Sequence, residues 1–83
     1  MDESIKINIQ YFAVLQEITG RASESISVQS NSTPKTLYKK LIKQYDLPPP
    51  NRLKVAVNDC FCSWDSRLSK DDKIVFIPPV TGG

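Results

Sequence analysis

The chain stops on Gly82-Gly83, and these residues are two of its three glycines. Just before them, Pro78-Pro79 follow an apolar run, residues 74–77, that is typical of a β-strand. Proline lacks the backbone N–H that a strand ladder needs, so the two prolines end the strand. Glycine has no Cβ and lets the backbone approach another surface closely. The pattern predicts a strand followed by a narrow tail.

Residues 78–83 extend to roughly 20 Å at about 3.3–3.6 Å per residue. That length suits a tail that threads a narrow channel in a partner and presents the α-carboxylate of Gly83 there. The alternative is a frayed terminus, because chain ends are commonly disordered. A frayed end is more often polar and mixed in composition. We therefore favour a presented tail, in which Gly83 presents its carboxylate and Gly82 keeps the threaded backbone narrow.

Cys60 and Cys62 are the second candidate for chemistry, because their thiols are reactive side chains. On a strand, residues two apart point to the same face. The chain has no histidine and no third cysteine, so a tetrahedral zinc site within one chain would need two carboxylates. Disulfides are rare in the cytosol. We expect both cysteines to fill space on a strand, and the alternative is a redox or persulfide role.

Composition and charge fit one small domain over residues 1–83, with residues 77 or 78–83 as its tail. Eleven basic and nine acidic residues give a net charge of +2. Four lysines gather within residues 35–43 without the arginines or aromatic residues of a nucleic-acid surface, and we interpret them as a solvated helix face. The acidic N-terminus and the lack of an apolar stretch of roughly 20 residues argue against a signal peptide and a membrane span. We expect a cytoplasmic protein that binds neither nucleic acid nor membrane.

Five strands and one main helix are expected to position these groups. Ile5, Ile7 and Ile9 alternate with polar residues, which is the pattern of a half-buried strand. Thr33-Pro34 offers a hydroxyl cap and a proline for the first turn of a helix. The expected elements are a strand from residue 5, a short helical turn at 13–18 closed by Gly20, a strand at 23–28, a helix from 34 that ends before the prolines 48–50, strands at 53–57, 60–64 and 74–77, an Asn58-Asp59 turn, and a polar stretch at 66–73 anchored by Leu68.

This order is that of an α+β fold, the ubiquitin-like β-grasp, in which one helix crosses one face of a mixed sheet and the first and last strands are central neighbours. If the isoleucines of the first strand face the helix, then Phe12, Val75 and Ile77 face away from it. Phe61 joins them from the hairpin. An apolar cluster on an uncovered face indicates a partner site. With the tail, the predicted partner-contacting residues are Phe12, Phe61, Val75, Ile77, Pro78, Pro79, Val80 and Thr81.

The chain resembles the small subunit of molybdopterin synthase, a family of ubiquitin-like sulfur carriers. The resemblance is carried by the end of the chain, by the first strand and helix, and by two later segments, and it spans nearly the whole sequence. Those segments are Phe76-Ile77-Pro78-Pro79-Val80-Thr81-Gly82-Gly83, Tyr11-Phe12-Ala13 with Glu17-Ile18-Thr19-Gly20, Val55-Ala56-Val57-Asn58, and Leu68-Ser69-Lys70-Asp71-Asp72-Lys73-Ile74. The cysteine pair and the triple proline depart from the family pattern.

The resemblance implies that Gly83 is first adenylated with ATP by a partner similar to the ubiquitin-activating enzymes, and that a persulfide sulfur then displaces AMP to leave a thiocarboxylate. The tail would insert into the large synthase subunit, where the sulfur attacks cyclic pyranopterin monophosphate to build the molybdopterin dithiolene. The chain would thus be no enzyme on its own but the sulfur-donating subunit of a sulfurtransferase, in a heterotetramer. It would hold no permanent cofactor or metal, and ATP would belong to the activating partner.

Two other classes of function share the same tail. A sulfur carrier for thiamine or for transfer-RNA thiolation would use the same activation with another acceptor. A ubiquitin-like modifier would instead join Gly83 to lysine through an isopeptide bond.

Overall fold

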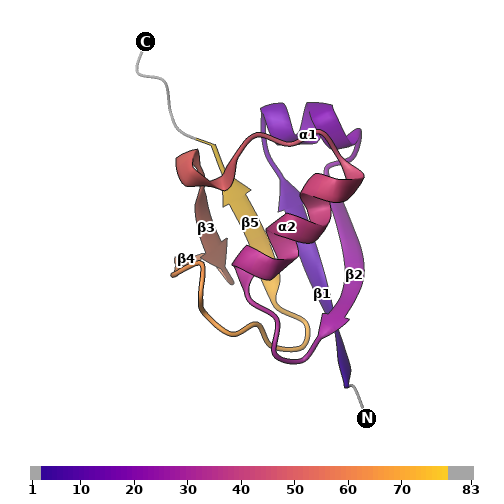
Figure 1. The fold of residues 1–83 in the computed structure, drawn as a ribbon, viewed down its shortest axis with the longest axis vertical. Coiled ribbons are helices and arrows are strands. Elements are labelled where there is room, and N and C mark those ends of the chain that lie inside the picture. The colour runs from indigo at the N-terminus through magenta and orange to yellow at the C-terminus, as the bar shows by residue number, and fades with distance from the viewer. Residues whose placement is uncertain (1–2, 79–83) are drawn as a thin grey trace.

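The computed structural model describes residues 3–78. Five strands, two α-helices and one 3-10 helix follow one another along this part of the chain (Figure 1). Their bounds are β1 Ser4–Tyr11, α1 Val14–Thr19, β2 Ser23–Gln29, α2 Pro34–Gln44, the 3-10 helix η1 Pro50–Arg52, β3 Lys54–Val57, β4 Cys60–Phe61 and β5 Lys73–Ile77. No helix within the described residues is long and apolar enough to cross a membrane.

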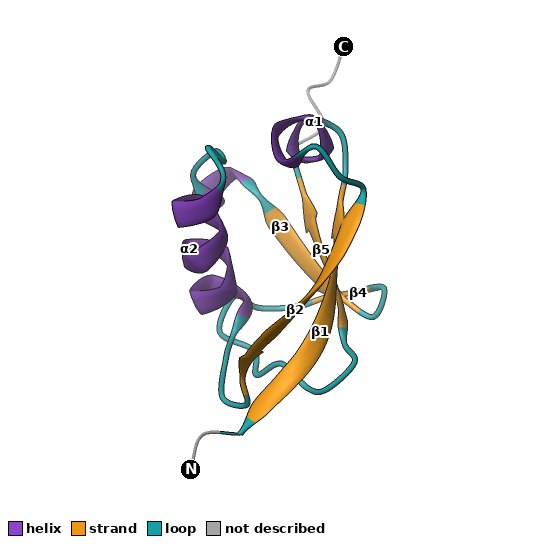
Figure 2. Cartoon of the chain, turned by 90° about the vertical axis from the view of Figure 1, so that its right-hand side faces the viewer, coloured by secondary structure: helices purple, strands orange, loops and turns teal. Residues whose placement is uncertain are grey.

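The strands form one mixed sheet in the order β2-β1-β5-β3-β4. Strands β1 and β5 are parallel neighbours, with Ile9 opposite Ile74 and Tyr11 opposite Phe76. The other pairs are antiparallel. Figure 2 shows α2 packed across one face of this sheet. The predicted β-grasp arrangement, with the first and last strands central and adjacent, is confirmed.

The core lies between the sheet and α2. Ile7, Ile9 and Tyr11 of β1 are at most 1% exposed, as the alternating pattern predicts. Ile74 and Phe76 of β5 are completely buried beside them. From α2, the residues that meet this layer are Leu37, Tyr38 and Leu41, while the lysines of the helix remain exposed. The lysines of α2 therefore lie on a solvated helix face, as predicted.

Helix α2 begins at a complete capping box. The side chain of Thr33 accepts a hydrogen bond from the backbone N–H of Thr36, and the side chain of Thr36 accepts one from the N–H of Thr33. These bonds satisfy two of the donors that a helix start leaves unpaired. Pro34 lies in the first turn, where the backbone N–H that proline lacks would have no partner within the helix. The helix ends at Gln44, so it stops before the three prolines.

Two turns use backbone conformations that their residues tolerate. Gly20 closes α1 in the left-handed region, with φ of 75°. Asn58 and Asp59 connect β3 to β4 with φ of 53° and 71°, which is the conformation that a two-residue hairpin requires. Both predicted turns are confirmed.

Strand β4 is shorter than predicted, because it covers Cys60–Phe61 instead of residues 60–64. After the strand, the N–H of Cys62 still donates to the carbonyl of Val55 at 3.1 Å, but the chain then leaves the sheet. The carbonyl of Trp64 accepts a hydrogen bond from the N–H of Lys35 at 3.0 Å, at the start of α2. This hydrogen bond holds the segment after β4 against the start of α2, and Trp64 packs against the core.

The three tyrosines of the chain each place the hydroxyl in a hydrogen bond. Tyr38 donates to the carbonyl of Pro48 at 2.6 Å, and burial raises its pKa to about 12. Tyr11 and Tyr45 both donate to the Oε2 atom of Glu24. Burial, and then the hydrogen bond to Glu24, raises the pKa of both hydroxyls above the ordinary value.

We expect the protein to lose stability as the pH rises above about 10, the ordinary tyrosine pKa. A tyrosine that stays neutral in the folded state but ionises in the unfolded chain stabilises the fold below pH 10, and this contribution is lost as pH rises toward 12. Urea unfolding at a series of pH values would measure the effect, and Tyr38→Phe should reduce the slope. Absorbance at 295 nm should detect phenolate at lower pH in urea than in buffer; equal titration curves would contradict the prediction.

Candidate functional site

The C-terminal segment of the chain follows directly after the end of β5. Ile77 is the last residue of this central strand and pairs with Lys54 of β3. Pro78 follows as the last described residue and is partly exposed. This end of the sheet also carries α1 (Figure 1). The remaining predicted site residues, Pro79, Val80, Thr81, Gly82 and Gly83, lie outside the described residues, so their roles stay predictions.

Phe12, Ile77 and Phe61 lie on the sheet face that α2 leaves uncovered. Phe12 follows Tyr11, the last paired residue of β1, and is 48% exposed, whereas Tyr11 is buried in the core. Ile77 is partly exposed at the end of β5. Phe61 of β4 is 71% exposed, the largest exposure among the large hydrophobic side chains of residues 3–78. We refer to Phe12, Phe61 and Ile77 as the outer-face patch.

Val75 is predicted to contact a partner from the outer face, which requires an exposed side chain. It lies between the core residues Ile74 and Phe76, so its side chain points to the outer face as its parity requires. It is nevertheless only 5% exposed. Its strand neighbours, Gln10 on β1 and Ala56 on β3, flank it, and Ala56 is itself 6% exposed. In the middle of a five-stranded sheet these side chains cover one another, so Val75 supports the patch and offers little area to a partner.

A lysine adjoins the patch, and sequence patterning did not identify it. Lys54 pairs with Ile77 across the ladder, and its ammonium nitrogen lies 5.9 Å from the centre of the Phe61 ring. A cation at this distance is attracted by the aromatic face. The patch is therefore apolar with a positive charge beside it. The signal in the sequence is the alternation of residues 53–57, which places Lys54 on the same face as Ala56.

The cysteine pair lies on the opposite side of the hairpin from Phe61. Cys60 is exposed, and Cys62 is partly buried against the core. Both are free thiols. Cys62 thus fills space as expected, whereas Cys60 packs little. No group of three or more Cys, Asp or Glu side chains suited to a metal ion occurs within residues 3–78.

The double substitution Cys60→Ser with Cys62→Ser should leave intact the sulfur transfer that the family resemblance implies. Neither thiol is close in sequence to the tail, and the exposed Cys60 contributes little packing. Initial rates of product formation with saturating partner would test this, with a melting curve as the control for folding. Loss of transfer in a folded variant that still binds its partner would instead favour the persulfide role.

The sheet order, the single helix across one face and the central last strand define an α+β protein of the ubiquitin-like β-grasp type. The chain matches the ThiS family over residues 9–83 and belongs to that family. The resemblance stated from the sequence, to ubiquitin-like sulfur carriers, is thereby confirmed.

Three relatives illustrate this placement. Over 81 residues the chain is 30% identical to the molybdopterin synthase sulfur carrier subunit of Escherichia coli strain K12, covering 93% of this chain and 99% of that protein. The crystal structure of SAMP1 from Haloferax volcanii matches with a TM-score of 0.78 and 19% identity, over 94% of this chain and 99% of that one. A ubiquitin of Caldiarchaeum subterraneum matches with a TM-score of 0.68 and 19% identity, over 98% of this chain and all of that one. The two structures establish a shared fold.

Proposed function

We propose that this protein carries sulfur as a thiocarboxylate on Gly83 and donates it, within a molybdopterin synthase, to cyclic pyranopterin monophosphate. The observation that carries the proposal is the position of β5. This strand lies at the centre of the sheet and leads directly to Pro78 and the Gly-Gly end, and the family match extends to residue 83. The identity to the Escherichia coli sulfur carrier subunit supports the choice of molybdopterin synthase.

The chemistry follows from the weak electrophilicity of a carboxylate. Adenylation of Gly83 with ATP releases pyrophosphate and gives an acyl-adenylate. The terminal sulfur of a persulfide then attacks the carbonyl carbon, AMP leaves, and reductive cleavage of the sulfur–sulfur bond by a thiol leaves the thiocarboxylate. A thio acid is much more acidic than an ordinary thiol and is ionised at neutral pH, and the anion is the nucleophilic form.

The described residues support a donor role more than a catalytic one. The chain has no histidine, and residues 3–78 contain no group of three or more acidic or thiol side chains suited to a metal ion. We therefore assign acid–base chemistry and phosphate binding to the large synthase subunit. ATP would be bound by the activating partner, a ubiquitin-activating-like adenylyltransferase, and the whole cycle would take place in the cytoplasm.

The outer-face patch would dock the large subunit while the tail enters it. Phe12 and Ile77 lie at the end of the sheet from which the tail departs, so one partner can contact both. Pro78 and Pro79 would continue this contact, and Val80 and Thr81 would line the entry. Gly82 would then pass the narrowest point and place Gly83 at the substrate.

The intact mass of the protein purified from its native host tests the proposal. Replacement of one oxygen by sulfur adds about 16 Da, and this species should disappear when the protein is incubated with the large subunit and cyclic pyranopterin monophosphate. A mass that never exceeds that of the plain chain, even after incubation with the activating partner, ATP and a sulfur donor, would contradict it.

The intact mass, combined with an assay for the molybdopterin product, separates the alternatives. A carrier for thiamine or transfer-RNA thiolation would show the added sulfur but no molybdopterin product. A ubiquitin-like modifier would appear as high-mass conjugates in which Gly83 is joined to lysine.

A further inference from the structure

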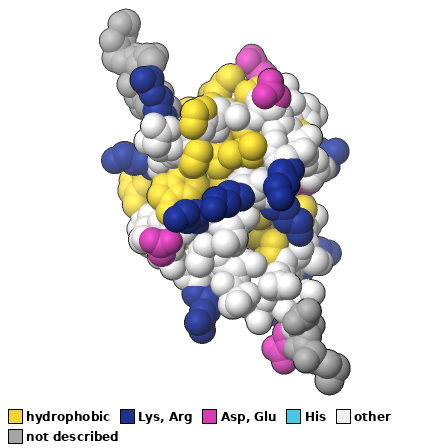
Figure 3. Space-filling view, in the orientation of Figure 1, with side chains coloured by type: hydrophobic (Ala, Val, Ile, Leu, Met, Phe, Trp, Pro, Cys, Tyr) yellow, Lys and Arg dark blue, Asp and Glu magenta, His cyan; other side chains and the backbone are white. Residues whose placement is uncertain are grey.

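A second surface lies on the helix side of the molecule, away from the outer-face patch. A groove of about 280 Å³ is lined by α2, by η1 and by the loop after β4. Its lining residues are Lys35, Lys39, Pro50, Asn51, Trp64 and Asp65. Figure 3 shows hydrophobic side chains gathered on this face and bordered by lysine and arginine side chains. The function proposed above makes no use of this groove.

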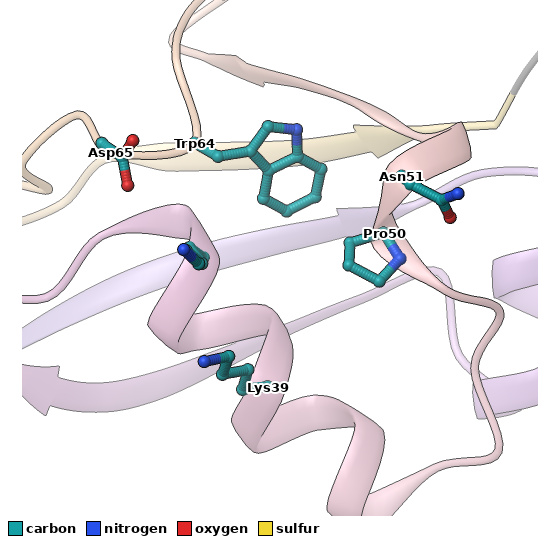
Figure 4. Close-up of a pocket in the computed structure, with 6 residues that line it drawn as sticks. Lys39, Pro50, Asn51, Trp64 and Asp65 are labelled. Atoms are coloured by element: carbon teal, nitrogen blue, oxygen red, sulfur yellow. The ribbon is translucent and has the colours of Figure 1, made fainter.

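Trp64 forms a rigid apolar surface in the groove. Its indole stacks on Phe76 with ring centres 5.6 Å apart and planes 17° apart, and Tyr38 meets it edge to face at 5.7 Å. Figure 4 shows the indole between α2 and the Pro50 segment. It remains partly exposed although the core holds it. An aromatic ring fixed in this way loses little entropy when a ligand covers it.

Hydrogen bonds hold the walls of the groove together. The N–H of Lys35 donates to the carbonyl of Trp64 at 3.0 Å, which ties the start of α2 to the loop after β4. The Tyr38 hydroxyl donates to the carbonyl of Pro48 at 2.6 Å, which ties α2 to the segment leading into η1. The groove is therefore formed before any ligand arrives.

The helix wall of the groove is positively charged. Lys35 and Lys39 are exposed and lie one above the other at i, i+4 spacing, and Lys43 continues the line. No carboxylate lies within ion-pair distance of these three lysines in the part of the chain that the structure describes. Asp65, at the end of the groove near Lys35, is the acidic residue of the lining. The lining thus carries two lysines against one carboxylate, and Lys39 is the lysine of the lining farther along the helix from Asp65.

We propose that this groove binds an extended acidic peptide segment of a partner protein, in which acidic and apolar residues alternate. The spacing supports this occupant. Lysines four apart on a helix are about 6 Å apart along its axis, at 1.5 Å per residue. Side chains two apart on an extended strand are about 6.6 Å apart and point to one side. Alternate carboxylates would therefore face Lys39 and its helical neighbours, while the intervening apolar side chains contact Trp64 and Pro50.

The groove lies on the helix side of the sheet, whereas Phe12 and Ile77 of the outer-face patch lie on the other side. Phe61, the third residue of the patch, lines a depression together with Trp64. A peptide bound against α2 would leave Phe12 and Ile77 accessible. The carrier could therefore remain tethered to one protein through the groove while it presents its tail to another. The inference does not depend on the identity of the sulfur acceptor.

Trp64 is the single tryptophan of the chain, so its fluorescence reports directly on the groove. The probe is an acetylated and amidated peptide in which Glu and Leu alternate over five positions, flanked by Ser-Gly. Titration of the full chain with this peptide should shift the Trp64 emission, and the affinity should fall as salt screens the charges. A peptide with Gln in place of Glu should bind about tenfold more weakly.

Two charge reversals on the same helix separate the groove from general electrostatic attraction. Lys39→Glu should weaken binding about tenfold. Lys40→Glu is the matched control: it makes the same change of charge on α2, but Lys40 lines a different depression with Val28 and Leu37. Its affinity should stay within about twofold of the original. Melting curves verify that both variants are folded.

Three results would overturn the proposal. The first is an unchanged Trp64 emission at millimolar peptide, and the second is an equal loss of affinity in the two lysine variants. The third is equal binding of the Glu and Gln peptides. Sedimentation showing that the free protein self-associates through this groove, in a manner abolished by Lys39→Glu, would assign the surface to a second copy instead.

Discussion

Removal of Gly83 is expected to abolish sulfur transfer while the melting temperature stays unchanged. All core residues lie between Ile7 and Phe76, so the deleted residue contributes nothing to the buried cluster of residues 3–78. The reacting carboxylate would move back to Gly82 and fall short by one residue, about 3.3–3.6 Å. Displacements of about 1 Å at a reacting centre already cost roughly 100-fold in rate. Product formation with the large subunit would therefore drop below detection.

Two measurements make this result interpretable. The first is the affinity of the truncated chain for the large subunit, which should change little because the outer-face patch is intact. The second is the intact mass after incubation with the activating partner and ATP. A fall of several degrees in melting temperature would show that the tail packs on the domain, and normal turnover would show that Gly83 is not the sulfur-bearing residue.

The alternation of isoleucines in the first strand and the order of the expected elements were enough to predict the architecture. Ile7 and Ile9 on one side, and Leu37 and Leu41 on the other, are buried together where one helix crosses one face of the sheet. The Thr33-Pro34 start and the Asn58-Asp59 turn were also readable, because each depends on a few adjacent residues. Local rules therefore fixed the elements and their order.

Features that depend on distant residues could not be predicted in this way. Val75 has the parity of an exposed residue, but its burial depends on Gln10 and Ala56, which pairing brings beside it. The pattern of residues 60–64 extends a strand, but the hydrogen bond between Lys35 and Trp64 directs the chain to the helix. The groove at Trp64 arises from three segments that are far apart in sequence. The residues that line the groove are present in the sequence, but the sequence pattern does not predict that they lie together.

The candidate site also contains both kinds of feature, those that follow from adjacent residues and those that depend on distant ones. Its outer-face patch follows from strand parity, so Phe12, Phe61 and Ile77 could be named in advance. Lys54 beside Phe61 could not, because a cation over a ring is a cross-strand contact. The tail residues after Pro78 were identified from their own chemistry and from the family resemblance, and they remain predictions.

The substitutions Phe12→Asp and Phe61→Asp should each weaken binding of the large subunit by about tenfold or more, without unfolding the protein. Full burial of a large apolar side chain is worth about 1.5–3 kcal/mol, and about 1.4 kcal/mol corresponds to a factor of ten in affinity. Phe12 is 48% exposed and Phe61 is 71% exposed in the free chain, so much of this area is available to a partner. A charged carboxylate in an apolar contact adds a desolvation cost to the lost area. Ile77→Asp should act in the same direction, although its side chain is less exposed.

Ile42→Asp provides the matched control for these variants. Ile42 is 38% exposed and lies on α2, on the other side of the sheet from the patch, so the same change from apolar to acidic should leave the affinity unchanged. Calorimetric titration against the large subunit, with a melting curve for each variant, measures both quantities. Folded Phe12 and Phe61 variants with full affinity would place the docking surface elsewhere. A large fall in melting temperature would mean that these rings stabilise the domain itself through the part of each ring that is buried in the free chain.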